Sequence, residues 1–135
     1  MLVYGEGVVE WVYELSGGAV TASSSGLGWM RNDKLIAGMS VEGWNGKNCY
    51  VHLRLEGYAP KEFCFAAVDW VFNQLKCNRM TAPVPQSNNK CLKLLRHIGF
   101  EQEAKLQEAS YDGGDLLFMR LWKEDCYLLN WNNHE

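Results

Sequence analysis

Three side chains in the first half of the chain are candidates for proton transfer. His52 carries an imidazole, whose reference pKa of about 6.5 lets it accept a proton near neutral pH. Tyr50 and Glu42 can orient or deprotonate a reacting group, directly or through water. The alternative for all three is a polar strand residue that is hydrogen-bonded across a sheet or solvated. These residue types therefore predict acid–base chemistry, with His52 as the first choice for the base.

The cysteines raise two other chemistries, a metal site and a nucleophilic thiol. Cys49 and His52 are spaced as C-x-x-H, but residues three apart on a strand point to opposite faces, and no second ligand pair follows at a suitable spacing. Cys64, Cys77 and Cys91 fall on predicted helices or at helix ends, where a buried structural thiol is the usual case. We therefore expect neither a metal nor a cysteine nucleophile. An odd number of widely spaced cysteines also favours a reducing compartment.

Alternating side chains place His52 on a strand with one buried and one polar face. Between residues 47 and 55, the odd-numbered residues from Cys49 to Leu55 are apolar, whereas the even-numbered residues from Asn48 to Arg54 are polar. Further strands are predicted at 27–31, 34–42, 79–85, 102–109 and 115–121, with turns at Asn32-Asp33, Asn45-Gly46 and Asp112-Gly113-Gly114. A loop is predicted at 16–28.

Three segments are predicted to be helical, at about 8–15, 60–76 and 87–98. The second has polar residues on a narrow stripe and apolar residues over the rest of its surface, which indicates a helix packed on a sheet. Pro60 suits a first helical turn, because its missing N–H would have had no partner there. In the third segment Ser87 or Asn88 can cap the N-terminus, Gly99 can end the helix, and Phe100 can fold back onto it.

Composition and charge are those of a soluble globular chain. With 47% hydrophobic and 21% charged residues, the chain is neither disordered nor collagen-like, and 135 residues suffice for one core. A net charge of −3 gives no overall attraction to nucleic acid or to an anionic membrane. No apolar run approaches the roughly 18 residues of a membrane span, and the N-terminus lacks the pattern of a secretory signal. We therefore expect a cytoplasmic protein.

The order of the predicted elements resembles the GNAT superfamily of acetyl-CoA-dependent N-acetyltransferases. The resemblance covers residues 34–126 and is concentrated in DWVFNQL, NRMTA, NNKC, LRHIGF and EA, at 69–75, 78–82, 88–91, 95–100 and 103–104. These blocks look like the branch that acetylates protein N-terminal amines, including ribosomal-protein alanine, and residues 34–55 are similar to small bacteriophage-encoded members. The resemblance implies a mixed α/β fold (α+β), with a mostly antiparallel sheet of about six or seven strands flanked by two main helices. It also implies one GNAT-like domain over 1–135 with a shortened N-terminal segment.

This resemblance also implies where acetyl-CoA binds. The strand ending at Leu55 would part from the strand at 79–85, and Pro83 and Pro85 favour the gap because they cannot donate ladder hydrogen bonds. The pyrophosphate would lie against the first amides of the helix that begins at Pro60, where unpaired N–H groups and the helix dipole attract anions. A backbone N–H at the end of the first strand would polarise the thioester carbonyl. The implied cofactor-binding residues are Leu53, Arg54, Leu55, Lys61, Glu62, Phe63, Asn88 and Cys91.

Three features differ from the family pattern. The stretch at 55–60 corresponds to the family's R/Q-x-x-G-x-G/A loop but has one Gly out of register, and Glu56 adds a negative charge where phosphates would bind. Leu95 stands where many members carry a Tyr that protonates the leaving thiolate, so water or another side chain would serve. Residues 1–26 replace a longer segment that usually closes the acceptor site, so an open acceptor pocket is expected.

The sequence therefore predicts transfer of acetyl from acetyl-CoA to a primary amine, with His52 as the base. Asn88 would contact the pantetheine arm or cap its helix, and the basic face of the helix at 87–98 is either solvated or holds the 3′-phosphate of CoA. The acceptor stays open between a protein N-terminus, a lysine, a small polyamine and an aminated nucleobase. The alternative is a catalytically inactive GNAT-like module that binds a host or viral protein. The expected location is the cytoplasm, that of a bacterial host if the protein is phage-encoded.

Overall fold

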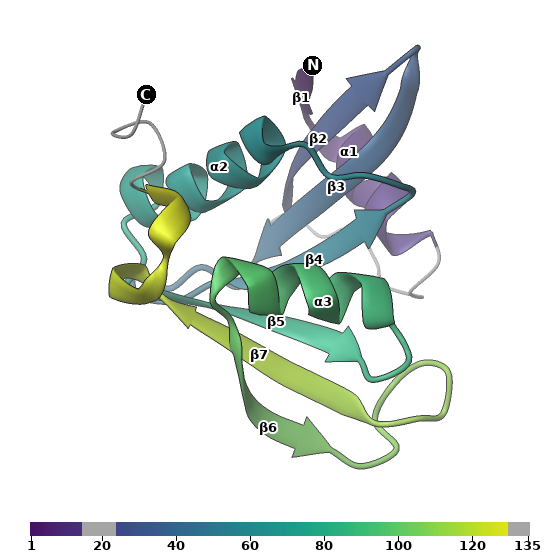
Figure 1. Ribbon diagram of the computed structural model, residues 1–135, viewed down its shortest axis with the longest axis vertical. Coiled ribbons are helices and arrows are strands. Elements are labelled where there is room, and N and C mark those ends of the chain that lie inside the picture. Colours follow the sequence, from purple (N-terminus) through teal and green to yellow (C-terminus); the bar gives the residue numbers. More distant parts are fainter. Residues whose placement is uncertain (15–23, 130–135) are drawn as a thin grey trace.

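The computed structural model describes residues 1–14 and 24–129. Over these residues a seven-stranded sheet has the order β1-β2-β3-β4-β5-β7-β6, and neighbouring strands are antiparallel except β4 and β5 (Figure 1). The strands are β1 (Leu2–Tyr4), β2 (Ser25–Arg31), β3 (Lys34–Glu42), β4 (Tyr50–Leu55), β5 (Arg79–Pro85), β6 (Glu101–Leu106) and β7 (Leu116–Trp122). The helices are α1 (Glu6–Tyr13), α2 (Lys61–Asp69) and α3 (Asn89–Ile98), with a π-helical turn at Trp70–Gln74 and a 3₁₀ turn at Lys123–Asp125. The predicted mixed, mostly antiparallel fold is confirmed.

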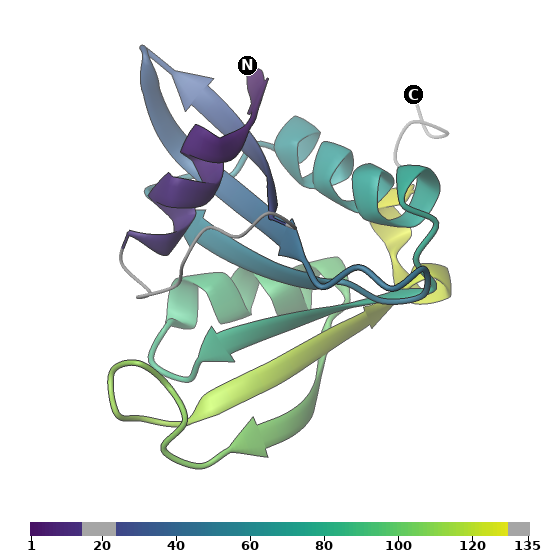
Figure 2. The same ribbon diagram turned by 180° about the vertical axis from the view of Figure 1, so that it is seen from behind.

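The helices cover opposite faces of the sheet, as the two ribbon views show (Figures 1 and 2). On one face α1 packs against β2, β3 and β4 through the apolar cluster Val8, Val9, Val12 and Tyr13. On the other face α2 and α3 contribute to the main core, with Phe63, Phe72 and Leu95 almost fully buried. A Cβ at Gly26 would lie 2.8 Å from the carbonyl oxygen of Gly5, so glycine lets α1 approach β2. Even-numbered residues of β4 therefore face α1, and odd-numbered ones face the core.

Differences from the predicted elements lie mainly at the start of the chain. Strand β1 was not predicted, because three residues are too few for an alternating pattern to be visible. It pairs with β2, and the Met1 amino group donates to the Met30 carbonyl oxygen at 2.8 Å. Helix α1 begins two residues before the predicted 8–15, and β2 begins at Ser25, inside the predicted loop at 16–28. Most of that loop lies outside the described residues.

Strand β4 begins later than predicted. The side-chain oxygen of Asn45 accepts the backbone N–H of Lys47 at 3.0 Å and that of Asn48 at 2.9 Å, so these residues form a turn and the strand starts only at Tyr50. The turn between β2 and β3 is as predicted: Asn32 and Asp33 both have positive φ, 52° and 63°, as a two-residue hairpin turn requires.

Helices α2 and α3 follow the predicted pattern with one change. After α2 the chain continues through a π-helical turn, in which the N–H of Leu75 donates to the carbonyl oxygen of Trp70 at 2.8 Å. At α3, the Asn88 side chain accepts the N–H of Cys91, and the N–H of Phe100 returns to Leu95 at 2.9 Å, which confirms the predicted cap and stop. None of the described helices is both long and apolar enough to cross a bilayer.

Strands β4 and β5 separate soon after they begin to pair. Their one register pair is Tyr50 with Thr81, and the N–H of Thr81 donates to the carbonyl oxygen of Cys49 at 3.0 Å. Because backbone groups alternate sides along a strand, the next positions of β5 that would donate toward β4 are Pro83 and Pro85. Neither proline has an N–H, whereas the groups on the other side of β5 keep it paired with β7 along its whole length. The sheet therefore splits beyond Thr81.

Candidate active site

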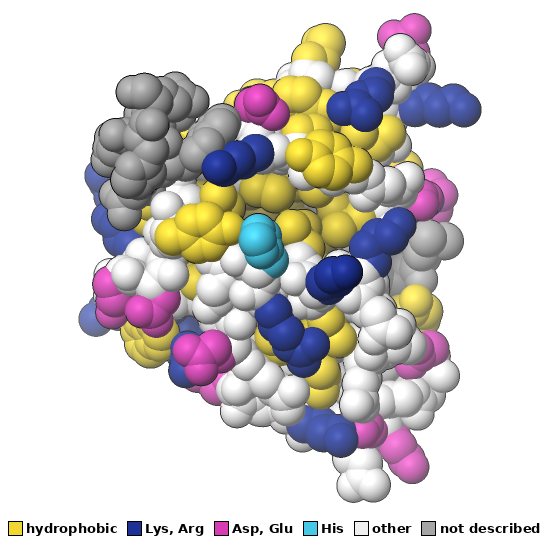
Figure 3. All heavy atoms as spheres, in the orientation of Figure 1, with side chains coloured by type: hydrophobic (Ala, Val, Ile, Leu, Met, Phe, Trp, Pro, Cys, Tyr) yellow, Lys and Arg dark blue, Asp and Glu magenta, His cyan; other side chains and the backbone are white. Residues whose placement is uncertain are grey.

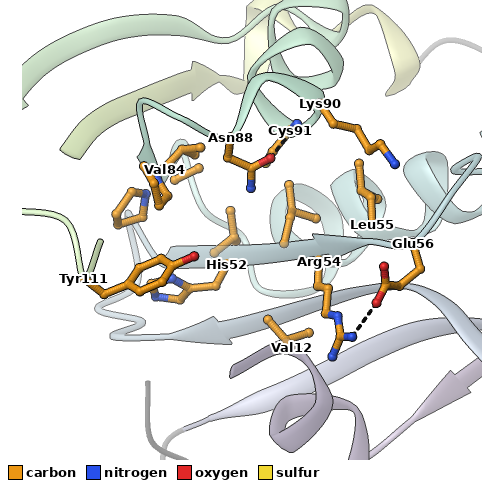
Figure 4. Close-up of a pocket in the computed structure, with 15 residues that line it drawn as sticks. Val12, His52, Arg54, Leu55, Glu56, Val84, Asn88, Lys90, Cys91 and Tyr111 are labelled. Carbon is orange, nitrogen blue, oxygen red and sulfur yellow. Dashed lines mark hydrogen bonds and ion pairs between the residues drawn. The ribbon is translucent and has the colours of Figure 1, made fainter. Parts of the chain in front are cut away.

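The split between β4 and β5 encloses a cavity of about 230 Å³ (Figure 4). Its walls are the β4 residues from Val51 to Leu55 together with Glu56, and the β5 residues from Ala82 to Pro85. Three residues at the start of α3, one from α1 and one from the loop between β6 and β7 complete it: Asn88, Lys90, Cys91, Val12 and Tyr111. The predicted gap is thus present, and side chains from both faces of the sheet reach its rim.

The backbone of β4 presents unused hydrogen-bonding groups to this cavity. The N–H of Glu56 donates to Ile36 of β3, so even-numbered residues of β4 direct their backbone groups toward β3. The odd-numbered residues Leu53 and Leu55 consequently direct theirs toward β5, beyond the point where β5 can pair. Backbone groups of this kind require a partner, which is water or an extended polar ligand. The amide of Arg54, also predicted to bind the cofactor, faces β3 instead.

His52 lies on the α1 face of β4 and lines the cavity. Its Nε2 lies 3.0 Å from Oε1 of Glu42 on β3, and its ring packs edge-on against Tyr13 at a centroid distance of 5.3 Å. Because a carboxylate only accepts hydrogen bonds, Nε2 is the donor to Glu42, and in the neutral tautomer with this proton the lone pair is on Nδ1. The structure therefore places Glu42 where its carboxylate can orient the imidazole of His52, the base that the sequence predicts.

A second hydrogen bond extends this cluster toward α1. Ser40 lies directly opposite His52 in the β3–β4 register, and its hydroxyl donates to the Tyr13 hydroxyl oxygen at 2.9 Å. Burial raises the pKa of Tyr13, so the phenol stays neutral at physiological pH. Tyr50, the third predicted acid–base candidate, lies directly opposite Glu42 in the β3–β4 register, but it is not among the residues that line the cavity, and its ring packs against Gly43.

Arg54 forms an ion pair with Glu56 beside the cavity. An Arg54 guanidinium nitrogen donates to the Glu56 carboxylate, an ion pair drawn in Figure 4, and a second donates to the Trp11 carbonyl oxygen at 2.8 Å. The guanidinium also lies 4.2 Å from the Trp11 ring centroid and 3.3 Å from a Glu14 carboxylate oxygen. The negative charge of Glu56, which the sequence places at the expected phosphate loop, therefore has a cationic partner.

The first backbone amides of α2 lie before the helical hydrogen-bond ladder begins. The helical hydrogen bonds begin when the N–H of Cys64 donates to the Pro60 carbonyl oxygen at 3.1 Å, so the N–H groups of Lys61, Glu62 and Phe63 precede the helical ladder. The Phe63 side chain is buried in the core, and that of Glu62 lies in a hollow beside β1 and β2. All three predicted residues therefore contribute backbone amides to the N-terminus of α2, where the helix dipole favours an anion.

A second cavity of about 260 Å³ lies between the start of α2 and the end of α3. Its walls include aromatic and basic side chains: Tyr58, Lys61, His97 and Tyr127. Figure 3 shows basic side chains gathered over α3 and around this hollow, with a histidine beside it. This hollow therefore adjoins the N-terminus of α2 through Lys61 and the end of α3 through His97.

Asn88 and Cys91 line the cavity at the start of α3. The Asn88 side-chain oxygen accepts the Cys91 N–H at 3.2 Å, so its amide nitrogen is the group left to donate, and Figure 4 shows that nitrogen directed toward the cavity. Cys91 is buried, and burial raises the pKa of its thiol to about 12. Cys91 is therefore a neutral wall of the site and has no thiolate character.

Several residues of this site were not selected from the sequence. Tyr13, Ser40 and Val12 enter because α1 packs on the face of β3 and β4 that carries His52. Ser40 had a usable signal, since it is the polar residue within the otherwise apolar run from Leu35 to Val41. Tyr111 lies in a loop whose placement depends on contacts that the local sequence does not display.

Comparisons with known proteins identify the fold. No protein-family model matches the chain, and no curated protein matches it. Among solved structures, a probable acetyltransferase is 20% identical with a TM-score of 0.66, covering 76% of this chain and 63% of that chain, less than two thirds of its length. Campylobacter jejuni N-acetyltransferase PseH in complex with acetyl coenzyme A is 18% identical with a TM-score of 0.62, covering 85% of this chain and 77% of that chain.

Variant forms of the spermidine/spermine N-acetyltransferase SpeG from Vibrio cholerae match at 15% identity with a TM-score of 0.71, covering 100% of this chain and 98% of that chain. Identities this low establish the fold alone. The expected N-terminal acetyltransferase branch, phage origin and cytoplasmic location stay predictions. What is established is that the described structure has the fold of the GNAT N-acetyltransferases, as the sequence predicted.

Proposed function

We propose that the protein transfers an acetyl group from acetyl-CoA to a primary amine. The observation that carries this proposal is the split between β4 and β5, which leaves the backbone groups of Leu53 and Leu55 facing a cavity with His52 at its rim. The solved PseH structure of the same fold is a complex with acetyl coenzyme A, which supports a CoA-type ligand for this chain.

The residues present fit such a ligand along its whole length. The pantetheine arm would pair with the β4 backbone and with the Asn88 amide nitrogen, as an added strand pairs with a sheet edge. The pyrophosphate would lie at the first amides of α2, because Arg54 holds the Glu56 charge. The nucleotide would reach the second cavity, whose walls are aromatic and basic.

Bound acetyl-CoA supplies an activated acyl group, and the protein supplies position and proton transfer. The N–H of Leu53 would donate to the thioester carbonyl oxygen, since hydrogen bonds aimed at developing charge lower the barrier. His52 Nδ1 would take the proton of the attacking amine, with Glu42 stabilising the imidazolium that forms. The His52–Glu42 pair thus performs the function of an oriented general base.

A thermal-shift titration with acetyl-CoA tests the proposal, because a ligand bound only by the folded state raises the melting temperature. We expect a saturable rise, and a His52→Ala variant that keeps this rise but loses about 100-fold or more in turnover with a panel of primary amines. A Tyr50→Phe variant is the matched control and should keep its turnover. No shift at millimolar acetyl-CoA would contradict the proposal and favour the catalytically inactive alternative.

A further inference from the structure

The β6–β7 loop is fastened to the mouth of the cavity. The Ser87 hydroxyl, in the turn between β5 and α3, donates to an Asp112 carboxylate oxygen at 2.6 Å. The N–H of Gln86 donates to the Asp115 carbonyl oxygen at 2.9 Å, from the same turn to the same loop. Two hydrogen bonds therefore join this loop to the turn that precedes α3.

The loop is also closed on itself. The other Asp112 oxygen accepts the N–H of Gly114 at 3.0 Å, and the N–H of Ser110 donates to the Gly114 carbonyl oxygen at 3.0 Å. The Ser87 hydroxyl, followed by the Gly114 N–H, holds the pKa of Asp112 below its usual value, so the carboxylate is ionised at neutral pH. Tyr111 lies between Ser110 and Asp112 and is thereby positioned from both sides.

Tyr111 shares the cavity wall with His52 but comes from the opposite strand pair. Figure 4 shows its hydroxyl directed into the cavity, on the side where His52 lies. Among the described residues that line the cavity, Tyr111 is the one phenol, and it is 63% exposed, so the mouth of the cavity gives access to it. Leu95, on the core side of α3, has no proton to give.

We infer that Tyr111 donates the proton that the sulfur of CoA takes up when the acetyl group leaves. This inference rests on the proposed function. The C–N bond forms and the C–S bond breaks, with its electron pair left on sulfur. The amine proton goes to His52 Nδ1, the Tyr111 hydroxyl proton goes to sulfur, and the proton on His52 returns to the Tyr111 oxygen through water, which restores both residues. Tyr111 and His52 both line the one cavity that a reacting sulfur would enter.

Binding of two ligands that differ only at the sulfur tests this assignment without turnover. Calorimetry with CoA and with desulfo-CoA would be run on the wild-type protein, on Tyr111→Phe and on Tyr4→Phe, a control at an exposed tyrosine of β1. We expect Tyr111→Phe to weaken CoA binding about 2- to 10-fold and to leave desulfo-CoA unchanged, since one hydrogen bond to sulfur is lost. The control should bind both ligands as the wild type does.

Rate measurements add a second readout. Release of free thiol from acetyl-CoA should fall about 100-fold in Tyr111→Phe with the KM for acetyl-CoA unchanged. Equal loss of affinity for CoA and desulfo-CoA would overturn the inference, because Tyr111 would then contact another part of the ligand. Unchanged CoA affinity would overturn it as well while leaving the proposed function intact, whereas a wild-type protein that binds neither ligand would overturn both.

Discussion

Asn88 is predicted to have two separable tasks, one for each end of its side-chain amide. Its oxygen caps α3 by accepting the Cys91 N–H at 3.2 Å, and its nitrogen is directed toward the cavity. Removing the cap in Asn88→Ala costs about 1 kcal/mol of unfolding free energy, which lowers the melting temperature by about 3–5 °C in a chain of this size. Asn88→Asp keeps an acceptor for the cap, and its charge at a helix N-terminus is favourable by about 0.3–1 kcal/mol. Asn88→Asp should therefore melt at or slightly above the wild-type temperature.

Between these two variants, the affinity for acetyl-CoA should follow the opposite order from stability. Both variants lose the nitrogen donor, worth about 0.5–1.5 kcal/mol, so the dissociation constant should rise about 2- to 10-fold in each, and Asp adds repulsion toward an anionic ligand. Calorimetric titration and thermal melts would measure the two effects on the same samples. Asn89→Asp adds the same charge at an exposed neighbour outside the cavity, so it controls for charge alone. Full acetyl-CoA affinity in Asn88→Asp would refute this account of the cavity.

Three further perturbations address other parts of the structure. Pro83→Val restores an N–H on the side of β5 that faces β4, so acetyl-CoA affinity should fall by up to about 10-fold as the strands pair further, measured by calorimetry. Glu56→Gln should strengthen acetyl-CoA binding about 2- to 5-fold, most at low salt, whereas Arg54→Met should weaken it because Glu56 loses its cation. Burial raises the pKa of Cys64 to about 11 and that of Cys91 to about 12, above their values in the unfolded chain. The contribution of these two thiols to the free energy of unfolding is therefore complete below about pH 8.5 and is lost as the pH rises toward 11–12. Thermal melts at pH values from 8 to 11 would measure this loss.

Each of these three predictions would be contradicted by a specific result. Tighter acetyl-CoA binding by Pro83→Val would show that the proline does not hold the strands apart. Glu56→Gln and Arg54→Met variants with equal affinities would remove the ion pair from the binding account. A Cys64→Ala/Cys91→Ala double variant should show a shallower loss of stability at alkaline pH, and an unchanged slope would assign that loss to other groups.

Much of the fold follows from local sequence. The strands at 34–42 and 79–85 are bounded as predicted, because alternation and flanking turns are visible within a few residues. The cap at Asn88 and the stop at Gly99 also depend on residues within one turn of helix. The split of the sheet was implied by the family resemblance, and the two prolines on one strand supplied a local physical reason for it.

What the sequence did not reveal depends on pairing and packing across the chain. The choice of Leu53 and Leu55 over Arg54 as cavity-facing amides requires the register of β4 against β3, which is known only once the sheet is assembled. The contacts of Arg54 with Trp11 and Glu14 depend on the approach of α1. The position of Tyr111 depends on a contact between two loops that are 25 residues apart in sequence. None of these has a local pattern from which to predict it.

Amide hydrogen exchange tests the central claim most directly, because the split sheet assigns alternate residues of β4 to different partners. With saturating acetyl-CoA, exchange at Leu53 and Leu55 should slow by about 10-fold or more, since their N–H groups would gain a ligand partner. Exchange at His52 and Arg54 should change little, because their N–H groups already face β3. Unchanged exchange at Leu53 and Leu55 in a protein saturated with acetyl-CoA would contradict binding between the separated strands.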